Sequence, residues 1–362
     1  MLNTGMRYRT GLFLLGLALL LKLVSIKPEW VEKGYTYGIY PLLSQIMRWL
    51  TGWLPFSLGD LVYAAAGIGI FYFIWKSVKA IRKNGIRKWW KPGLYKIFCT
   101  LLLVYLLFNV LWGLNYNRQG VAHQLGLKVQ RYDLPDAMQL TQALQARLNF
   151  FAGQTDTTKR TKLNTNSKLF QKAISVYQVA ATSLPYLNYK NPSIKPSLYS
   201  SVGQYFGFTG YYNPFSGEAQ IKTSIPVFLK PFVATHEIAH QLGYAKENEA
   251  NFVAFLSSKQ SRDTDFLYSL YYDLYAYALR EVYNRDTAAA MGFRERLHPQ
   301  VLRDNEILKA YFISTQNRIE PIISRFYDQY LKWNNQKAGV QTYNEVVALL
   351  IAYGKKFGWD AI

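Results

Sequence analysis

Three long apolar runs lie in the first third of the chain, separated by polar segments. They cover about residues 10–26, 57–75 and 97–116. A helix of about 20 residues spans the roughly 30 Å hydrocarbon core of a bilayer, so each run is long enough to cross it. The pattern therefore predicts a membrane domain over residues 1–116 with three transmembrane helices.

The ends of these runs carry further signals. Arg7 and Arg9 precede the first run, as in a signal peptide, but no small-x-small cleavage site follows Lys22. We therefore expect an uncleaved anchor.

Ser57 and Asp60 stand three residues apart at the start of the second run, which is the spacing of a helix cap. Between the first two runs, residues 37–55 (YGIYPLLSQIMRWLTGWLP) predict a helix lying in the membrane interface.

The basic residues predict the orientation of the membrane domain. The chain has 42 Lys and Arg against 22 Asp and Glu, and residues 76–96 hold eight basic side chains without an acid. Short basic loops stay in the cytoplasm, so this loop and the N-terminus are expected there. Three spans then place the rest of the chain on the periplasmic side of the inner membrane. Because the charge has this topological role, we expect the lipid bilayer and no nucleic acid as a partner.

Residues 117–362 have the composition of a soluble domain. Helical periodicity predicts helices at 134–153, 167–184, 264–284 and 339–354. Turn residues and aromatics alternate over 197–223, which is typical of short strands joined by tight turns. The predicted fold class is α+β, an α-rich extracytoplasmic domain with a small sheet.

One motif in this domain carries chemistry: His236-Glu237-Ile238-Ala239-His240. Residues four apart share a helix face, so both imidazoles can bind one Zn²⁺ ion. Glu237 is rotated by about 100° from His236, beside the open coordination position, where it can act as general base. With only four histidines in the chain, roughly 0.001 matches to this motif are expected by chance.

A catalytic zinc usually has a third protein ligand. Gly243 can end the helix, and the next helical segment carries Glu247 and Glu249, which point to different sides. If Glu247 is the ligand, Asn251 lies one turn on and can hydrogen-bond a ligand imidazole. This favours Glu247, with Glu249 as the alternative.

These residues resemble the gluzincin metallopeptidases, which place a third, glutamate ligand on a later helix, often in a Glu-x-x-Ala-Asp pattern. In this chain Asn251 stands at the position of that aspartate, and the gap after His240 is shorter than in the best-known members. The resemblance implies a zincin-like domain and a zinc peptidase. The whole layout also resembles an uncharacterised bacterial membrane family, a domain of unknown function, with N-terminal spans, a GYYNPFSGEA-like segment and HEIAHQLG followed by EANF.

The segment before the motif also fits a peptidase. Residues 208–221 can supply an edge strand that pairs with an extended peptide substrate. Tyr211 and Tyr212 are candidate donors to a developing oxyanion, and aromatic core packing is at least as good an explanation of either side chain.

We therefore expect a membrane-anchored zinc-dependent peptidase that hydrolyses a peptide or protein substrate in the cell envelope. The alternative is a catalytically inactive, zinc-stabilised envelope sensor or binding module. The motif itself is compatible with both.

Overall fold

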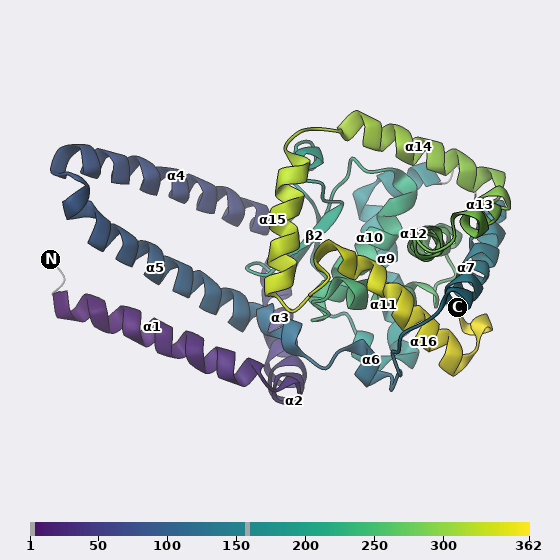
Figure 1. Ribbon diagram of the computed structural model, residues 1–362, viewed down its shortest axis with the longest axis horizontal. Helices are drawn as coiled ribbons and strands as arrows, with labels where there is room; N and C mark the ends of the chain where they lie inside the picture. Colours follow the sequence, from purple (N-terminus) through teal and green to yellow (C-terminus); the bar gives the residue numbers. More distant parts are fainter. Residues whose placement is uncertain (1–3, 156–159) are drawn as a thin grey trace.

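The computed structural model describes residues 4–155 and 160–362. The chain is mostly helical and contains a small three-stranded sheet, as predicted. Long helices extend from one side of a helical body, which holds the sheet and the C-terminal half of the chain (Figure 1). The sheet and the helices around it position the candidate site.

The extension consists of α1 (Thr4–Ser25), α4 (Leu58–Asn84) and α5 (Ile86–Leu111). Two of them, α4 and α5, are individually long and apolar enough to span a membrane. α1 meets that criterion only together with residues 28–52, as a pair of helices bent by 100°. The third span therefore stays a prediction. Ser57 caps α4 by accepting a hydrogen bond from the backbone N–H of Asp60, as expected.

Residues 76–96, predicted as a basic loop, are helical except at Gly85, and their place in the cytoplasm stays a prediction. α4 continues to Asn84, and α5 begins at Ile86, so only Gly85 separates them. Gly85 has a φ of 78°, which glycine adopts without steric cost. Lysine and arginine are good helix formers, so the helices continue through the basic residues. α5 also ends at Leu111, earlier than predicted, and a 3-10 turn (Gly113–Asn117) follows.

A helical segment crosses the base of the extension. It comprises α2 (Pro28–Trp30), a π-helical stretch (Val31–Ile39) and α3 (Tyr40–Gly52). The helix predicted within residues 37–55 is thus present. One side of this segment exposes large apolar side chains, including Leu42, Trp49 and Trp53, which are 65%, 66% and 76% exposed.

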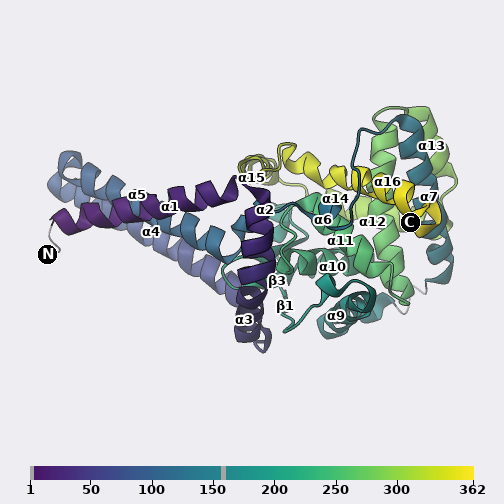
Figure 2. The same cartoon turned by 90° about the horizontal axis from the view of Figure 1, so that it is seen from below.

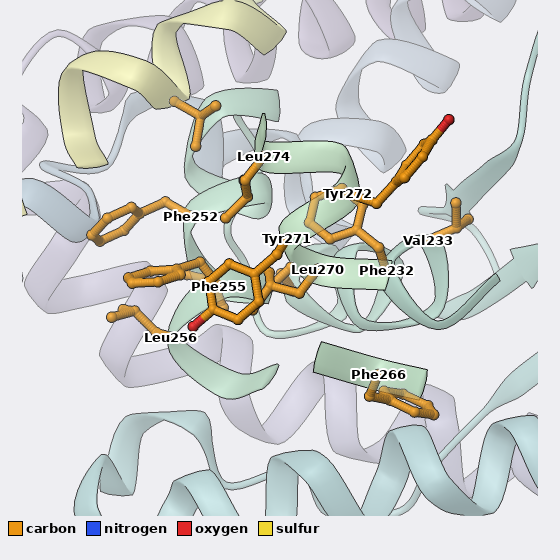
Figure 3. Packing of buried hydrophobic residues seen from close by; sticks show 14 of the residues in the cluster. Phe232, Val233, Phe252, Phe255, Leu256, Phe266, Leu270, Tyr271, Tyr272 and Leu274 are labelled. Carbon is orange, nitrogen blue, oxygen red and sulfur yellow. The ribbon is translucent and has the colours of Figure 1, made fainter. Parts of the chain in front are cut away.

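The predicted helices of the C-terminal body are present. They are α7 (Leu134–Gln154), α9 (Asn166–Ser183), α12 (Thr264–Tyr283) and α16 (Val346–Phe357). The last begins later than predicted because residues Gly339–Glu345 form a 3-10 turn. Apolar side chains of α10 (Lys230–Gln241), α11 (Glu247–Ser258) and α12 pack together in the main core, as Figure 3 shows for Phe232, Phe255 and Leu270.

The sheet has the order β1-β3-β2. β1 (Ile194–Pro196) pairs parallel with β3 (Glu218–Ile221), and β2 (Gly210–Asn213) pairs antiparallel with β3. All three strands lie within or next to the predicted strand region. β2 is therefore an edge strand, and β2 and β3 both pack on α10.

The helices between residues 287 and 333 were not predicted. They are α13 (Thr287–Glu295), α14 (Pro299–Thr315) and α15 (Glu320–Trp333). A short helix, α6 (Val121–Gln124), was also not predicted. α15 lies where the extension joins the body, transverse to α4 and α5 (Figures 1 and 2).

Candidate metal centre

The motif His236–His240 lies on α10, and the next helix, α11, begins at Glu247. Gly243 ends the first helix with a φ of 87°, and a Cβ atom at this position would come within 2.9 Å of the Tyr40 ring. Only glycine fits both the backbone conformation and the space. This turn brings the start of α11 back beside the two histidines.

The structure brings His236, His240 and Glu247 together. Their ligand atoms all lie within 4.8 Å of one another, and all three residues are buried. Oε2 of Glu247 is 3.1 Å from Nε2 of His236 and 3.4 Å from Nε2 of His240. Tetrahedral bonds of about 2.1 Å separate neighbouring donor atoms by about 3.4 Å, so this donor set fits a zinc ion.

Hydrogen bonds at the far side of each imidazole orient the rings. Nδ1 of His236 lies 2.7 Å from Oδ1 of Asn251, and Nδ1 of His240 lies 2.7 Å from the carbonyl oxygen of Tyr244. Both partners are acceptors, so each Nδ1 carries a proton, and each Nε2 is the atom that faces Glu247 and could bind a metal. Asn251 thus occupies the supporting position that the sequence predicted.

Glu237 is buried beside this cluster, with 4% of its surface exposed. Its Oε2 has no hydrogen-bond partner among the described residues. Burial raises the pKa of Glu237 to about 7. A Cβ atom built on Gly210 would lie 2.7 Å from its Oε1, so the start of edge strand β2 passes directly against this carboxylate. A buried carboxylate with a free oxygen and a pKa near neutrality suits proton transfer.

The electrostatics of the cluster favour an ionised Glu247. Burial raises the pKa of this carboxyl, but the imidazoles of His240 and His236 outweigh the burial and hold it well below its ordinary value. For His240 the two effects have the opposite signs. Burial lowers the pKa of this imidazole, but the carboxylates of Glu247 and Glu237 outweigh the burial and raise it to about 9. The site is thus an anionic carboxylate held against two imidazoles, an arrangement that a divalent cation can bridge.

The alternative ligand Glu249 points elsewhere. A Cβ atom on Gly120 would clash with its Oε1, and Nζ of Lys246 is 3.6 Å from the same oxygen. Two residues on a helix differ by about 200° in direction, which explains the separation from Glu247. Glu249 is therefore not part of the three-residue cluster.

The two candidate oxyanion donors have other surroundings. The hydroxyl of Tyr211 donates to Oδ1 of Asp60 and lies 3.0 Å from Oγ of Ser197. Tyr212 packs against Trp112, with ring centroids 5.0 Å apart, in the core between the membrane helices and the body. The structure thus ties Tyr211 to the start of α4 and Tyr212 to aromatic packing.

Two other tyrosines contact the cluster, and the sequence analysis missed both. The hydroxyl of Tyr327 in α15 donates to Oε1 of Glu247 at 2.8 Å. The ring of Tyr343 stacks on His236 with a centroid distance of 6.3 Å. Both lie at least 80 positions after Glu247 in the sequence, and no local motif marks them.

The membrane part of the chain holds the end of α10, which was also not predicted. Nε1 of Trp112 donates to the carbonyl oxygen of His240 at 3.0 Å. The carbonyl oxygen of Gln241 accepts hydrogen bonds from the Tyr40 hydroxyl at 2.9 Å and the Arg48 guanidinium at 3.0 Å. The last carbonyls of a helix lack intrahelical donors, so these contacts complete α10 and fix it to the membrane part.

Comparison with known proteins gives one match. The model of a family described as "Protein of unknown function (DUF3810)" matches residues 35–351. No curated protein and no solved structure matches the chain.

Proposed function

The chain belongs to this DUF3810 family, and we propose that it is a membrane-anchored zinc-dependent peptidase of the gluzincin type. The observation that carries the proposal is the convergence of His236, His240 and Glu247, with Glu237 beside them. These residues would hold the zinc through two Nε2 atoms and one carboxylate oxygen. A bound zinc ion lowers the pKa of a coordinated water to about 7 and polarises a carbonyl group.

The chain's own residues supply the remaining steps. Oε2 of Glu237 would take a proton from the attacking water and pass it to the nitrogen of the departing amine. Asn251 and the Tyr244 carbonyl keep the imidazoles oriented throughout, because they hold both Nδ1 protons. Tyr327 steadies the ligand carboxylate through its hydrogen bond to Oε1 of Glu247.

The edge strand β2 supports a peptide as substrate. An extended peptide can pair with the free backbone groups of an edge strand. Gly210 begins β2 beside Glu237, so a peptide added to this edge would pass next to the proposed base. The substrate would then be an extended segment of a protein or peptide in the cell envelope.

The arrangement of the helices supports the proposed topology with three spans. The basic residues around Gly85 lie at the tip of the α4–α5 hairpin, and the body lies at the opposite ends of these helices (Figure 1). Under the positive-inside rule a cytoplasmic tip places the body in the periplasm. This orientation would give the proposed peptidase access to envelope proteins.

The test uses the full chain in lipid nanodiscs. We expect one zinc ion per chain by elemental analysis and zinc-dependent cleavage of a pool of quenched fluorescent peptides. Glu237→Gln should retain the zinc and lose at least 100-fold in rate, because general-base catalysis contributes about 10²–10⁴-fold. Glu306→Gln, at an exposed position of α14, is the matched control. Absence of stoichiometric zinc, or equal cleavage by Glu237→Gln and the wild type, would refute the proposal.

A second candidate is an inactive zinc-stabilised sensor or binding module. The burial of the site favours it, since His236, Glu237 and His240 are only 4–7% exposed. Chelation distinguishes the two functions. Removal of a catalytic zinc should abolish cleavage and leave the fold largely intact, whereas removal of a structural zinc should unfold the body.

A further inference from the structure

Helix α15 carries both buried and exposed apolar side chains. On the inner side, Leu331 is fully buried and Tyr330 contacts α5. On the outer side lie Ile319, Ile322, Phe326 and Trp333, which recur at intervals of three, four and seven residues and are 50%, 54%, 73% and 76% exposed. Side chains at this spacing form one stripe along a helix. We call these four residues the outer stripe.

The position of α15 relative to the membrane helices is fixed by direct contacts. The ring of Tyr330 packs edge-on against Phe108, with centroids 6.3 Å apart, and its hydroxyl lies 3.4 Å from that of Tyr116. Phe108 is three residues before the end of α5, so α15 meets this helix at its last turn. A helical turn rises about 5.4 Å, so α15 packs within about one turn of the body-side end of α5.

The orientation of α15 also matches a membrane surface. Figures 1 and 2 agree that α15 runs transverse to α4 and α5 at their body-side ends. α3, whose exposed face carries Leu42 and Trp49, lies at the same junction. Tryptophan and phenylalanine on a helix lying in the membrane plane are typical of an interfacial helix.

We propose that the outer stripe of α15 is a lipid-binding surface that lies in the interface of the leaflet nearest the body. The partner is the bilayer itself, because α15 packs on the last turn of α5 and lies across the body-side ends of the long helices. Burial of the four apolar side chains in the acyl boundary would remove them from water, which is the driving force for interfacial helices. This inference does not depend on whether the metal site is catalytic.

The same helix connects this surface to the candidate metal centre. Tyr327 of α15 donates its hydrogen bond to Glu247 one turn along from Tyr330. A helix with its outer face in the interface and its inner face on a metal ligand would cover the site from the membrane side. A substrate reaching the buried Glu237 from this side would have to displace α15 within the membrane interface.

The test measures membrane depth with spin labels on the full chain. The single native cysteine is removed by Cys99→Ser, and nitroxides are attached to Phe326→Cys or, separately, Trp333→Cys. Met291→Cys is the matched control, because Met291 is an apolar side chain on α13 and is 56% exposed. Helix α13 lies on the side of the body away from the membrane helices (Figure 1). Each protein is placed as one copy per nanodisc of phosphatidylethanolamine and phosphatidylglycerol.

Labels at 326 and 333 should be relaxed by oxygen, which concentrates in lipid, at least threefold more effectively than by a water-soluble nickel chelate. The label at 291 should show the reverse preference. The proposal is overturned if all three labels prefer the nickel chelate. A second sample, in vesicles of the same lipids, holds several copies together. The proposal is also overturned if the label at 326 is shielded from the chelate only in this sample and couples to the label of another copy, because a second copy then covers the stripe. Two label positions guard against a local disturbance by either substitution.

Discussion

The indole nitrogen of Trp112 donates a hydrogen bond to the backbone oxygen of His240, a residue of the candidate metal centre, at 3.0 Å. Trp112 directly follows α5, and it is 5% exposed. Its ring also lies edge-on to the His240 imidazole, with centroids 5.9 Å apart. α10, the helix that carries two of the three proposed ligands, is therefore held by the membrane part of the chain, and the two parts share one core cluster.

Replacement of Trp112 by phenylalanine should destabilise the body. The variant loses the indole hydrogen bond and leaves a cavity, which together cost about 1–3 kcal/mol. Thermal unfolding of the full chain in nanodiscs measures the change as a lower midpoint temperature. Trp90→Phe, at a half-exposed position of α5, is the matched control and should unfold like the wild type. Equal midpoints for Trp112→Phe and Trp90→Phe would contradict the role assigned to Trp112.

Asn251 should set the zinc affinity through His236. Loss of a hydrogen bond that orients a metal-binding histidine typically lowers affinity 10- to 100-fold. We expect this loss for Asn251→Leu, measured by competition with a chromophoric chelator, while Asn251→Asp should retain most of the affinity because it keeps an acceptor. Asn248→Leu on the same helix is the control, since Asn248 contacts Glu345 instead of a histidine. Similar zinc affinities for the two leucine variants would rule out this contribution.

The cluster of proposed ligand residues was predictable because its geometry is local. A spacing of four places His236 and His240 on one helix face. Asn251 lies one turn after Glu247, which favoured Glu247 as the third residue, and the structure brings Glu247 to the two histidines. These arguments need only helical periodicity and the chemistry of a histidine ring.

The other contacts of the site depend on distant parts of the chain. Tyr327 on α15 contacts Glu247, and Trp112, which follows α5, contacts the end of α10. Nothing in the local sequence of either residue indicates these partners. The same limit applies to Asp60. Its expected place at the start of α4 was correct, but its carboxylate also accepts hydrogen bonds from Tyr211 and from the backbone of Leu198. Only the fold reveals that use.

A methyl group at Gly210 should interfere with Glu237. A Cβ atom there would lie 2.7 Å from Oε1 of Glu237 and 2.8 Å from Cγ1 of Val233, closer than van der Waals contact allows. Gly210→Ala should therefore move the carboxylate and slow peptide cleavage about 10- to 100-fold, because small misplacements of a catalytic group have effects of this size. The bound zinc should remain near one per chain.

Gly292→Ala is the control for this substitution. Gly292 lies on α13, and an added Cβ atom meets nothing within 4 Å. Its cleavage rate and zinc content should match the wild type. A Gly210→Ala protein with an unchanged rate would show that Glu237 is not positioned by β2.

Asp273 should make the stability of the fold depend on pH. Oδ2 of this α12 residue has no hydrogen-bond partner among the described residues, and burial raises its pKa from 3.8 to about 8. Because the pKa is higher in the folded state, the folded chain binds this proton more tightly than the unfolded chain. The stabilisation is present at low pH and is lost as the pH rises from about 4 to about 8. Asp273→Asn removes the titrating group and keeps the size of the side chain.

The difference in unfolding midpoint between Asp273→Asn and the wild type should therefore increase in favour of the variant between pH 5 and pH 8. Thermal unfolding of the full chain in nanodiscs at several pH values measures this difference, and the comparison cancels groups that titrate in both proteins. Asp360→Asn, at an exposed position near the C-terminus, is the control for the removal of one acidic side chain. If the difference for Asp273→Asn does not change with pH, the carboxyl has the same proton affinity in the folded and unfolded chains, and its burial has no energetic consequence.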